Sequence, residues 1–551
     1  MVWAGPGGLS EGAMDGEVLI VGAGPTGLTL AIDLGRRGIR CIVIEQKERP
    51  AFLPKMERVN ARSMEIYRRM GLAQQIRGAG LRSDCPMDVY IILGLDKAPL
   101  LHLPYPSVAE AQARTRSIND GSLPLEPYQL ISQYTLEPLL KSVAETIPSV
   151  TVRYGCEFLS LTQDSGGVTA GLRNSDGRVE DVRAAYLVGC DGGSSSVRKE
   201  LGIELAGEAN LLELRQALYR SDELFDRLPI GNGPGKGRHY HVADDKATFL
   251  IMQDSTKHWT LHSVVGTDRE MDVAFERTVS VPVKYQRLSC APWRQNLLLA
   301  EHYGKGRVFL AGDAVHLVIP TGGLGMNSGV GDAIDLSWKL AATLRGWGGP
   351  NLLRSYEIER RQIGDRNVGA SRYATIGRRK WRSMWRPNIR DDSPAGEETR
   401  RNLSAVADIE QRKSNEMIGA ELGYRYVDSP IICNVPGGPE QLFRDYQPTT
   451  WPGARLPHLW LDDGTPIQDH IPDGYSILKL GGSTADVTDL ESAIRARGAP
   501  VSVLDVPDSV ARDVYGYDLI LLRPDMHVVW RGQGPPADAA KVAAIATGYS
   551  S

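Results

Sequence analysis

The sequence has few cysteines, and no two of them stand close together. The six are Cys41, Cys85, Cys156, Cys190, Cys290 and Cys433, and none forms a CxxC or CxxxxC pair. Zinc sites and redox-active disulfides need thiols at short, regular spacings. The sequence therefore indicates neither a metal site nor a dithiol active site, and it favours a reducing, cytoplasmic setting.

Long apolar runs and an excess of one charge are missing as well. No apolar stretch reaches the length of a membrane span, and the first residues, MVWAGPGGLSEGAM, lack the basic start and apolar core of a signal peptide. We interpret residues 1–14 as a loose leader. The formal net charge is only −4, which argues against a polyanionic partner such as nucleic acid. We expect neither a membrane nor a nucleic-acid partner.

The N-terminal part of the chain carries a glycine motif between two predicted strands. In EVLIVGAGPTGLTLAIDLGRRGIRCIVIEQ, residues 17–46, a short apolar strand precedes Gly22, Gly24 and Gly27, and an apolar helical pattern follows. A second strand ends at Glu45. The first glycine allows the tight turn, the second admits a pyrophosphate, and the third lets helix and strand pack closely. The acidic residue is placed to bind a ribose hydroxyl, so the segment predicts a dinucleotide site.

No second complete GxGxxG follows a strand, and this absence narrows the choice of enzyme. Enzymes with two such folds, including the class B monooxygenases, are disfavoured, as are disulfide reductases because of the missing cysteine pair. The stretch GNGPGKG, residues 231–237, is glycine-rich but has the wrong spacing and no strand before it. We interpret it as a flexible loop, with a substrate or nucleotide contact as the alternative.

Two later segments repeat the pattern of a strand that ends at an Asp-Gly or Gly-Asp pair. One is AAYLVGCDGGSSSVRKELGI, residues 184–203, where a strand ends at Asp191. The other is GRVFLAGDAVHLVIPTGGLGMNSGVGDAIDLSWKLA, residues 306–341. There Asp313 would reach a ribityl or pyrophosphate hydroxyl, and the glycines that follow Pro320 would let backbone N–H groups approach an electron-poor ring.

Together the three motifs resemble the class A flavoprotein monooxygenases, the aromatic or phenol-type hydroxylases. The resemblance covers roughly residues 15–380 and implies FAD as cofactor, with NADPH or NADH as transient reductant. The segment ISQYTLEPLL, residues 131–140, resembles the part of the family whose glutamine contacts the flavin. The family usually has Gln where this chain has Leu324, which implies a changed contact near the flavin edge or the substrate. The expected cofactor-binding residues are Gly22, Gly24, Pro25, Thr26, Gly27, Glu45, Gln46, Lys55, Arg62, Gln133, Asp191, Gly312, Asp313, Pro320, Gly323, Gly325, Met326 and Asn327.

The resemblance also implies the reaction and its partners. The expected activity is hydroxylation of a small phenolic or aromatic substrate with O2 and NAD(P)H through a flavin C(4a)-hydroperoxide. The protein would position the ring and exclude water. Pocket candidates are Trp293, Tyr240 and His241, with His262 as a further one. A lone histidine on a strand is more often structural, and His316 is expected to pack rather than to react.

The predicted fold class is α/β, with a Rossmann-type FAD-binding domain (GR2-like), a β-sheet substrate domain and a C-terminal thioredoxin-like domain. The last resembles the C-terminal domain of the larger phenol hydroxylases through ARLPH and LLRPDMHVVWRG, and it has no cysteine after Cys433. Thiol chemistry is therefore excluded there, and a structural role, for example in a homodimer, is expected. The predicted boundaries are 1–14 leader, 15–204 FAD-binding domain, 205–290 substrate sheet, 291–380 second FAD-binding part with its following helix, 381–424 linker and helical region, and 425–551 thioredoxin-like domain.

Two alternatives to the hydroxylase remain open. One is a flavoenzyme of the same fold that performs Baeyer–Villiger insertion, epoxidation or oxidative decarboxylation on a polycyclic natural product. The other is a non-enzymatic FAD-binding protein. The structure of the product would separate the first from hydroxylation, and NAD(P)H turnover with oxygen would exclude the second.

Overall fold

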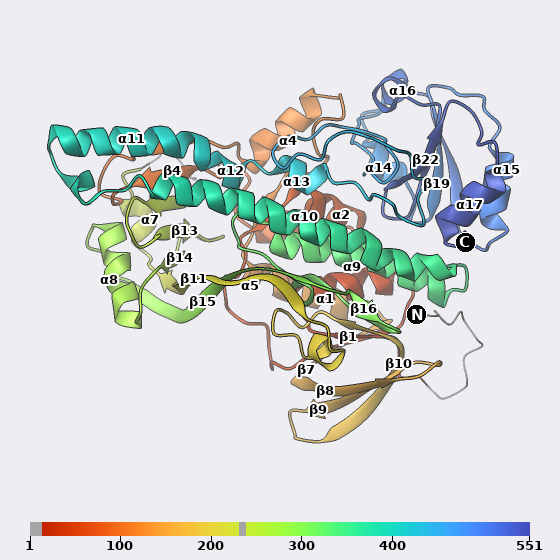
Figure 1. Ribbon diagram of the computed structural model, residues 1–551, viewed down its shortest axis with the longest axis horizontal. Helices are drawn as coiled ribbons and strands as arrows, with labels where there is room; N and C mark the ends of the chain where they lie inside the picture. Colours follow the sequence, from red (N-terminus) through yellow and green to blue (C-terminus); the bar gives the residue numbers. More distant parts are fainter. Residues whose placement is uncertain (1–13, 231–237, 551) are drawn as a thin grey trace.

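Two eight-stranded sheets and one four-stranded sheet, linked by long helices, form the framework of the protein (Figure 1). The computed structural model describes residues 14–230 and 238–550. The glycine-rich stretch 231–237 and all but the last residue of the predicted leader lie outside the described residues. The predicted α/β class with three such units is confirmed.

The first sheet has the parallel core expected of a dinucleotide-binding domain. Its strands run in the order β16 (Gly304–Lys305), β17 (Val308–Leu310), β10 (Val179–Gly189), β1 (Gly16–Val21), β2 (Cys41–Glu45) and β7 (Val150–Tyr154). The five strands from β17 to β7 are mutually parallel. An antiparallel extension from β10 through β9 (Val168–Asn174) and β8 (Cys156–Gln163) projects away from the rest (Figure 1).

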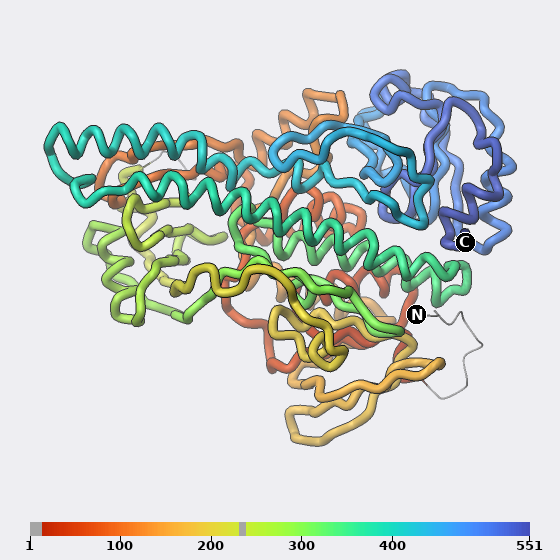
Figure 2. The backbone as a smooth tube through the Cα atoms, in the orientation of Figure 1, coloured from red at the N-terminus to blue at the C-terminus, as the bar shows by residue number. Residues whose placement is uncertain are grey.

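Helices cover this sheet and complete its apolar core. The helices α1 (Pro25–Arg36), α5 (Gln133–Glu145) and α9 (Gly325–Leu344) lie against it. Figure 2 shows how the chain leaves this region and returns, so that the green segment with β17 and α9 lies beside the red N-terminal strands. The chain also forms the short pair β3 (Arg58–Val59) and β6 (Gln129–Leu130), and the helices α2 (Ala61–Arg69), α3 (Ala73–Ala79), α4 (Val108–Ser117) and α6 (Ser196–Glu200).

The second sheet is wider than the range 205–290 that the sequence predicts. Its order is β18 (His316–Leu317), β15 (Gln286–Ala300), β11 (Leu205–Arg220), β14 (His258–Ser263), β13 (Phe249–Met252), β12 (His239–Val242), β4 (Val89–Ile92) and β5 (Leu101–Leu103). One face is buried under α7 (Leu224–Arg227) and α8 (Asp268–Val279). The predicted boundaries are wrong at both ends, because β4 pairs in parallel with the distant β12 and β15 continues to residue 300.

The predicted linker 381–424 is a packed helical hairpin. Helix α10 (Pro350–Arg382) crosses the middle of the molecule and α11 (Pro394–Glu410) lies beside its second half (Figure 1). Trp381 at the end of α10 is fully buried and packs with Leu403 of α11 and Ile91 of β4. The hairpin thus covers one end of the second sheet. The short helices α12 (Arg412–Asn415) and α13 (Ile418–Leu422) follow.

The C-terminal domain has the four-stranded mixed sheet of the predicted thioredoxin-like fold. The order is β20 (Val501–Val506), β19 (Tyr475–Leu480), β21 (Leu519–Leu522) and β22 (Val528–Gly532), with α14 (Ile467–His470), α15 (Thr488–Arg495), α16 (Ser509–Tyr515) and α17 (Ala539–Thr547) around it. The stretch 452–461, which contains ARLPH, forms only isolated bridges. Cys433, just outside the sheet, donates its backbone N–H to Val529 of β22.

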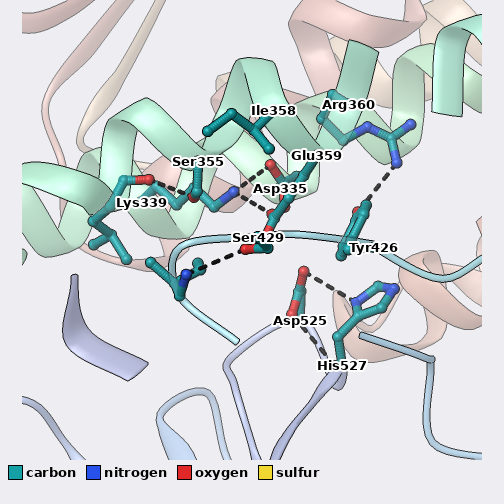
Figure 3. Close-up of polar contacts among 12 residues, drawn as sticks. Asp335, Lys339, Ser355, Ile358, Glu359, Arg360, Tyr426, Ser429, Asp525 and His527 are labelled. Atoms are coloured by element: carbon teal, nitrogen blue, oxygen red, sulfur yellow. Dashed lines mark hydrogen bonds and ion pairs between the residues drawn. The ribbon is translucent and has the colours of Figure 1, made fainter. Parts of the chain in front are cut away.

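A buried cluster of charges fastens this domain to α9 and α10 (Figure 3). The Arg523 guanidinium donates to Asp335 at 2.7 Å, to Glu359 at 2.6 Å and to Asp525 at 2.7 Å. Lys339 donates to both Asp335 and Glu359 at 2.6 Å. All of these side chains are at most 2% exposed. We refer to Asp335, Lys339, Glu359, Arg523 and Asp525 as the interdomain charge cluster.

The cluster holds three carboxylates against two permanent cations, so one negative charge is poorly compensated. Burial, reinforced by the charge of Glu359, raises the pKa of Asp335 to about 7. By contrast, Arg523 and His527 hold the pKa of Asp525 well below its usual range. Removing one partner from such a cluster leaves a charge without water or counter-ion, which costs far more than breaking an exposed pair.

We expect Arg523→Met to lower the free energy of unfolding by about 3–5 kcal/mol, because it leaves buried carboxylates uncompensated. Arg495→Met is the control, since Arg495 in the same domain forms an ion pair with Glu491 and its side chain is 58% exposed. It should cost at most about 1 kcal/mol. Urea unfolding measures both, and equal losses in the two variants would contradict the interpretation.

The raised pKa of Asp335 predicts a pH dependence. Its folded pKa of about 7 lies above the ordinary value of 3.8, so this group favours folding at low pH and loses that contribution as the pH rises through 7. The Tm of wild type minus that of Asp335→Asn should therefore fall between about pH 4 and pH 7 and level off above pH 7. The matched variant Asp505→Asn, at a side chain that is 76% exposed, should give a flat difference. A rising difference for Asp335→Asn would refute the assignment.

Candidate functional site

The three sequence motifs meet at one edge of the first sheet. Strands β1, β10 and β17 are adjacent and parallel, with Val21 opposite Gly189 and Gly189 opposite Leu310. Each motif begins where its strand ends, so the motifs leave the sheet side by side. The carboxyl edge of a parallel sheet is where α/β proteins bind dinucleotides.

The glycines of the first turn have three different physical roles. Gly22 has a positive φ of 107°, and a Cβ there would lie 2.4 Å from the carbonyl oxygen of Cys190. A Cβ on Gly27 would lie 2.0 Å from the oxygen of Gly22. Gly24 caps α1, just before Pro25, without a side-chain hydrogen bond, and a Cβ there would meet nothing within 4 Å. The open space at this helix start suits a pyrophosphate.

The next strand adds the side chains expected for a ribose and its surroundings. Glu45 accepts from the backbone N–H of Ala23 at 3.2 Å and of Lys47 at 3.1 Å, so its carboxylate is fixed beside the glycine turn. Gln46 starts an exposed stretch that lines a surface hollow up to Phe52. Gln133 at the start of α5 donates to Glu137 at 3.0 Å.

The third motif is held in place by one buried carboxylate. Asp332 of α9 accepts from the N–H of Gly312 at 3.0 Å, from His316 Nε2 at 2.8 Å and from Arg360 Nε at 2.8 Å. The Arg360 and His316 charges keep the pKa of Asp332 low despite complete burial. His316 is 1% exposed and its pKa is raised by Asp332, which agrees with the packing role predicted for it.

Asp313, which follows the Gly312 that Asp332 holds, faces solvent. Its side chain is exposed, yet desolvation by the surrounding protein raises its pKa, with His316 and Lys55 opposing. This combination is expected of a carboxyl on the wall of a solvent-filled hollow. Thr26 closes the other side, since a Cβ on Gly312 would lie 2.7 Å from its hydroxyl. The exposed Lys55 lies close enough to Asp313 to affect its pKa, and its contact with the cofactor stays a prediction.

The glycine loop that follows, residues 318–324, is held by hydrogen bonds with Asn327 and Arg58. Asn327 donates to the oxygens of Gly323 at 2.7 Å and Arg58 at 3.2 Å, and its own oxygen accepts from the N–H of Asn60. Gly323 has φ +67° and accepts no side chain without crowding the Arg58 guanidinium. Pro320 accepts from the N–H of Gly323, and Gly325 and Met326 begin α9.

One predicted cofactor contact is placed elsewhere. Arg62 is buried against the C-terminal domain, where it donates to the oxygen of Asp525. Asp191 lies just after the end of β10, where a Cβ on Gly22 would come within 3.0 Å of its Cα, and its carboxylate caps α6 by accepting from the hydroxyl of Ser195 and two backbone N–H groups. Leu324 is buried and packs with residues of α10 and with Met417 and Ala420. The cofactor contacts expected of the other residues stay predictions.

The second sheet divides the substrate candidates between its two faces. Tyr240 points into the core under α8 and stacks on Tyr90 with ring centroids 5.6 Å apart, so its predicted pocket role is wrong. His262 and the half-buried Trp293 share the opposite face, 6.3 Å apart. His241 lies on that face too, but it is buried against Trp381 and Gln411, and burial lowers its pKa well below the ordinary value.

Sequence reasoning missed Arg58, Asp332 and Arg360. Arg58 donates to the oxygen of Gly322 at 2.9 Å and pairs with Glu421 at 3.0 Å. Gly331 could have indicated the close approach of Arg360, because a Cβ at this position would lie 2.8 Å from the Arg360 guanidinium. Arg58 and Asp332 carry no local signature, because their partners are far away in the chain.

We expect Gly24→Ala to weaken dinucleotide binding by about tenfold or more, since the methyl group would enter the open space at the start of α1. The apoprotein should keep its stability within about 1 kcal/mol, because the methyl group meets no protein atom. Gly78→Ala is the control, as Gly78 also has open space around a Cβ but lies on α3. Calorimetric titration with FAD measures binding, and unchanged affinity in Gly24→Ala would overturn the pyrophosphate assignment.

Comparison with known proteins agrees with the geometry. The family model of the FAD binding domain matches residues 15–371, and that of the aromatic-ring hydroxylase C-terminal domain matches residues 449–548. The FAD-dependent monooxygenase apdD of Emericella nidulans is 33% identical, over 98% of this chain and 92% of that protein. The aklavinone 12-hydroxylase RdmE of Streptomyces purpurascens is 31% identical, over 95% of this chain and 97% of that protein.

A solved structure extends the agreement to the whole fold. RebC with bound 7-carboxy-K252c superimposes with a TM-score of 0.89 at 31% identity, covering 98% of this chain and 100% of that one. In the described residues, no helix is long and apolar enough to cross a membrane. The open helix start, the fixed acidic residue and the anchored glycine loop fit FAD. The chain belongs to the FAD-dependent aromatic-ring hydroxylases, and it is a monooxygenase that uses FAD with NAD(P)H as reductant.

Proposed function

We propose that this monooxygenase hydroxylates a phenolic ring held between the second sheet and the glycine loop. FAD, when bound, supplies the transfer of one oxygen atom from O2 to the ring after reduction by NAD(P)H. The start of α1 at Gly24 would bind the pyrophosphate, Glu45 would orient a ribose hydroxyl, and Asp313 would hold a hydroxyl of the ribityl–phosphate arm. Lys55 and Gln133 would contact the same arm.

One observation carries the proposal: the second sheet and α10 both contact the glycine loop. Ile319 of the loop packs with Leu297 of β15 and Val368 of α10, and Ser371 of α10 donates its hydroxyl to the oxygen of Ile319 at 2.8 Å. A ring on the sheet face that carries Trp293 would therefore lie near the loop that approaches the flavin. These apolar contacts also exclude water, which the chemistry requires.

The named activities of relatives support a phenolic substrate. RdmE is named for hydroxylation of aklavinone, and another relative, 30% identical, is a 2,4-dichlorophenol 6-monooxygenase. The second candidate is a different oxidation of a polycyclic natural product, which the likeness to the RebC complex with 7-carboxy-K252c favours. The mass and connectivity of the product distinguish the two. A small substrate, a homodimer and a cytoplasmic location stay predictions.

Anaerobic stopped-flow reduction of the FAD-loaded protein tests the proposal. NADPH and NADH are compared, with and without phenol, 2-naphthol and alizarin. We expect at least one phenol to accelerate flavin reduction by about tenfold or more, since a bound ring should favour the productive arrangement. Anisole is the control without an ionisable hydroxyl group. If reduction is already fast and no phenol changes its rate, the result would contradict acceleration by a bound phenol. It would favour the second candidate, a different oxidation of a polycyclic natural product.

A further inference from the structure

One stripe of α10 faces the second sheet and is anchored at both ends. Ser371, Thr375, Arg378 and Arg382 recur at helical spacing on one side of the helix. Ser371 is bonded to the glycine loop. At the other end, Arg382 donates to the oxygens of Val242 at 3.1 Å and of Thr248 at 3.0 Å. The segment between these anchors is therefore fixed against the sheet.

The polar atoms between the anchors have no protein partner. The hydroxyl of Thr375, which is 7% exposed, and Nε of Arg378 are buried without a hydrogen bond. Across from them on β14, His262 is 8% exposed and its Nδ1 also lacks a partner. Buried polar atoms are nearly always satisfied by protein, water or ligand. Three such atoms on two facing elements indicate a polar ligand.

A row of rings lies beneath this polar group. The Arg378 guanidinium is 5.4 Å from the ring centroid of Phe249. Phe249 stacks on His262 with centroids 4.3 Å apart and planes 4° apart, and Trp293 meets His262 edge-on. In the strand registers Phe249 and His262 are directly opposite each other. The row therefore places aromatic side chains next to a cation.

The charges around this row leave Arg378 uncompensated. Arg238 pairs with Glu57 at 3.0 Å, and Glu57 also bonds His239 at 2.8 Å. Asp244 lies 3.7 Å from Arg382. Among the described residues no carboxylate forms an ion pair with the half-buried Arg378. Burial together with the Arg382 charge lowers its pKa to about 9, although the charge of Glu57 opposes this shift. An anion beside Arg378 would relieve this desolvated positive charge.

We propose that Arg378, Thr375 and His262 form a subsite for an anionic oxygen on the aromatic substrate, either a carboxylate or an ionised phenol or enol. The ring of that substrate would lie along Phe249 and Trp293. The inference rests on the proposed function, because it places the substrate on this sheet face. It narrows the substrate class to aromatic compounds that carry an acidic group.

Calorimetric titration of the FAD-loaded protein without reductant tests the subsite. The first probe pair is 3-hydroxy-2-naphthoate and 3-hydroxy-2-naphthamide, and the second is 4-nitro-1-naphthol and its methyl ether. Wild type should prefer the ionised member of a pair by about tenfold or more. A preference in the first pair alone identifies a carboxylate, and one in the second pair identifies an ionised hydroxyl group.

Variants assign the preference to Arg378. Arg378→Met should abolish the preference for the ionised probe, and Arg378→Lys should keep part of this preference. Thr375→Val should weaken the preference. Arg379→Met is the matched control, because Arg379 is the exposed neighbour of the same charge and should keep the wild-type preference. Circular dichroism and FAD content verify folding. The proposal is overturned if wild type binds neither pair, shows no preference, or keeps its preference in Arg378→Met.

Failure of this inference is distinguishable from failure of the proposed function. Oxygen-dependent NAD(P)H oxidation that phenols stimulate, without any charge preference in titration, would retain the hydroxylase and remove the subsite. The opposite outcome is that titration shows an Arg378-dependent preference while no phenol accelerates reduction of the flavin. That result would support the subsite and exclude phenol hydroxylation as the reaction.

Discussion

The ionised carboxylate of Asp332 is the contact on which the rest of the structure depends. It holds the N–H of Gly312 and the ring of His316, which fixes the third motif, and it is paired with Arg360 of α10. Arg360 in turn bonds the hydroxyl of Tyr426 at 3.1 Å, and the Arg523 guanidinium lies 4.9 Å from the Tyr426 ring. A series of buried contacts therefore runs from the third motif to the interdomain charge cluster, and Figure 3 shows its link between Arg360 and Tyr426.

This series explains the use of a thioredoxin-like domain that has no cysteine in its sheet. The domain contributes Arg523 and Asp525 to the cluster, and Glu359 cannot stay ionised in the interior without the Arg523 and Lys339 charges, which lower its pKa to about 2. The domain thus acts as a counter-charge for α9 and α10. Burying such charges seldom adds net stability over apolar packing, so their value here lies in fixing one arrangement of helices and loops.

The cofactor half of the site could be predicted from sequence, and the substrate half could not. Gly22, Gly27 and Glu45 act through local turns at strand ends, which leave a pattern in a short stretch of sequence. The prediction for Arg62 was wrong because a helix near a cofactor loop has two sides. The Arg62 side chain lies on the side that faces Asp525. Tyr240 misled for a related reason: alternation along a strand does not say which face is the core. Arg58 and Asp332 act through partners far apart in sequence, which no local pattern reveals.

Helix α10 joins the two halves of the enzyme as one rigid element. Its first half carries Glu359, a member of the interdomain charge cluster, and Arg360, which pairs with Asp332 at the third motif. Its second half carries Arg378 and Arg382 over the second sheet. An uninterrupted helix transmits position along its axis, because every turn is hydrogen-bonded to the next. The same buried charges that hold the third motif therefore also fix the position of Arg378 and Arg382 over the second sheet, where we propose that the substrate ring lies, and the C-terminal domain supplies two of those charges.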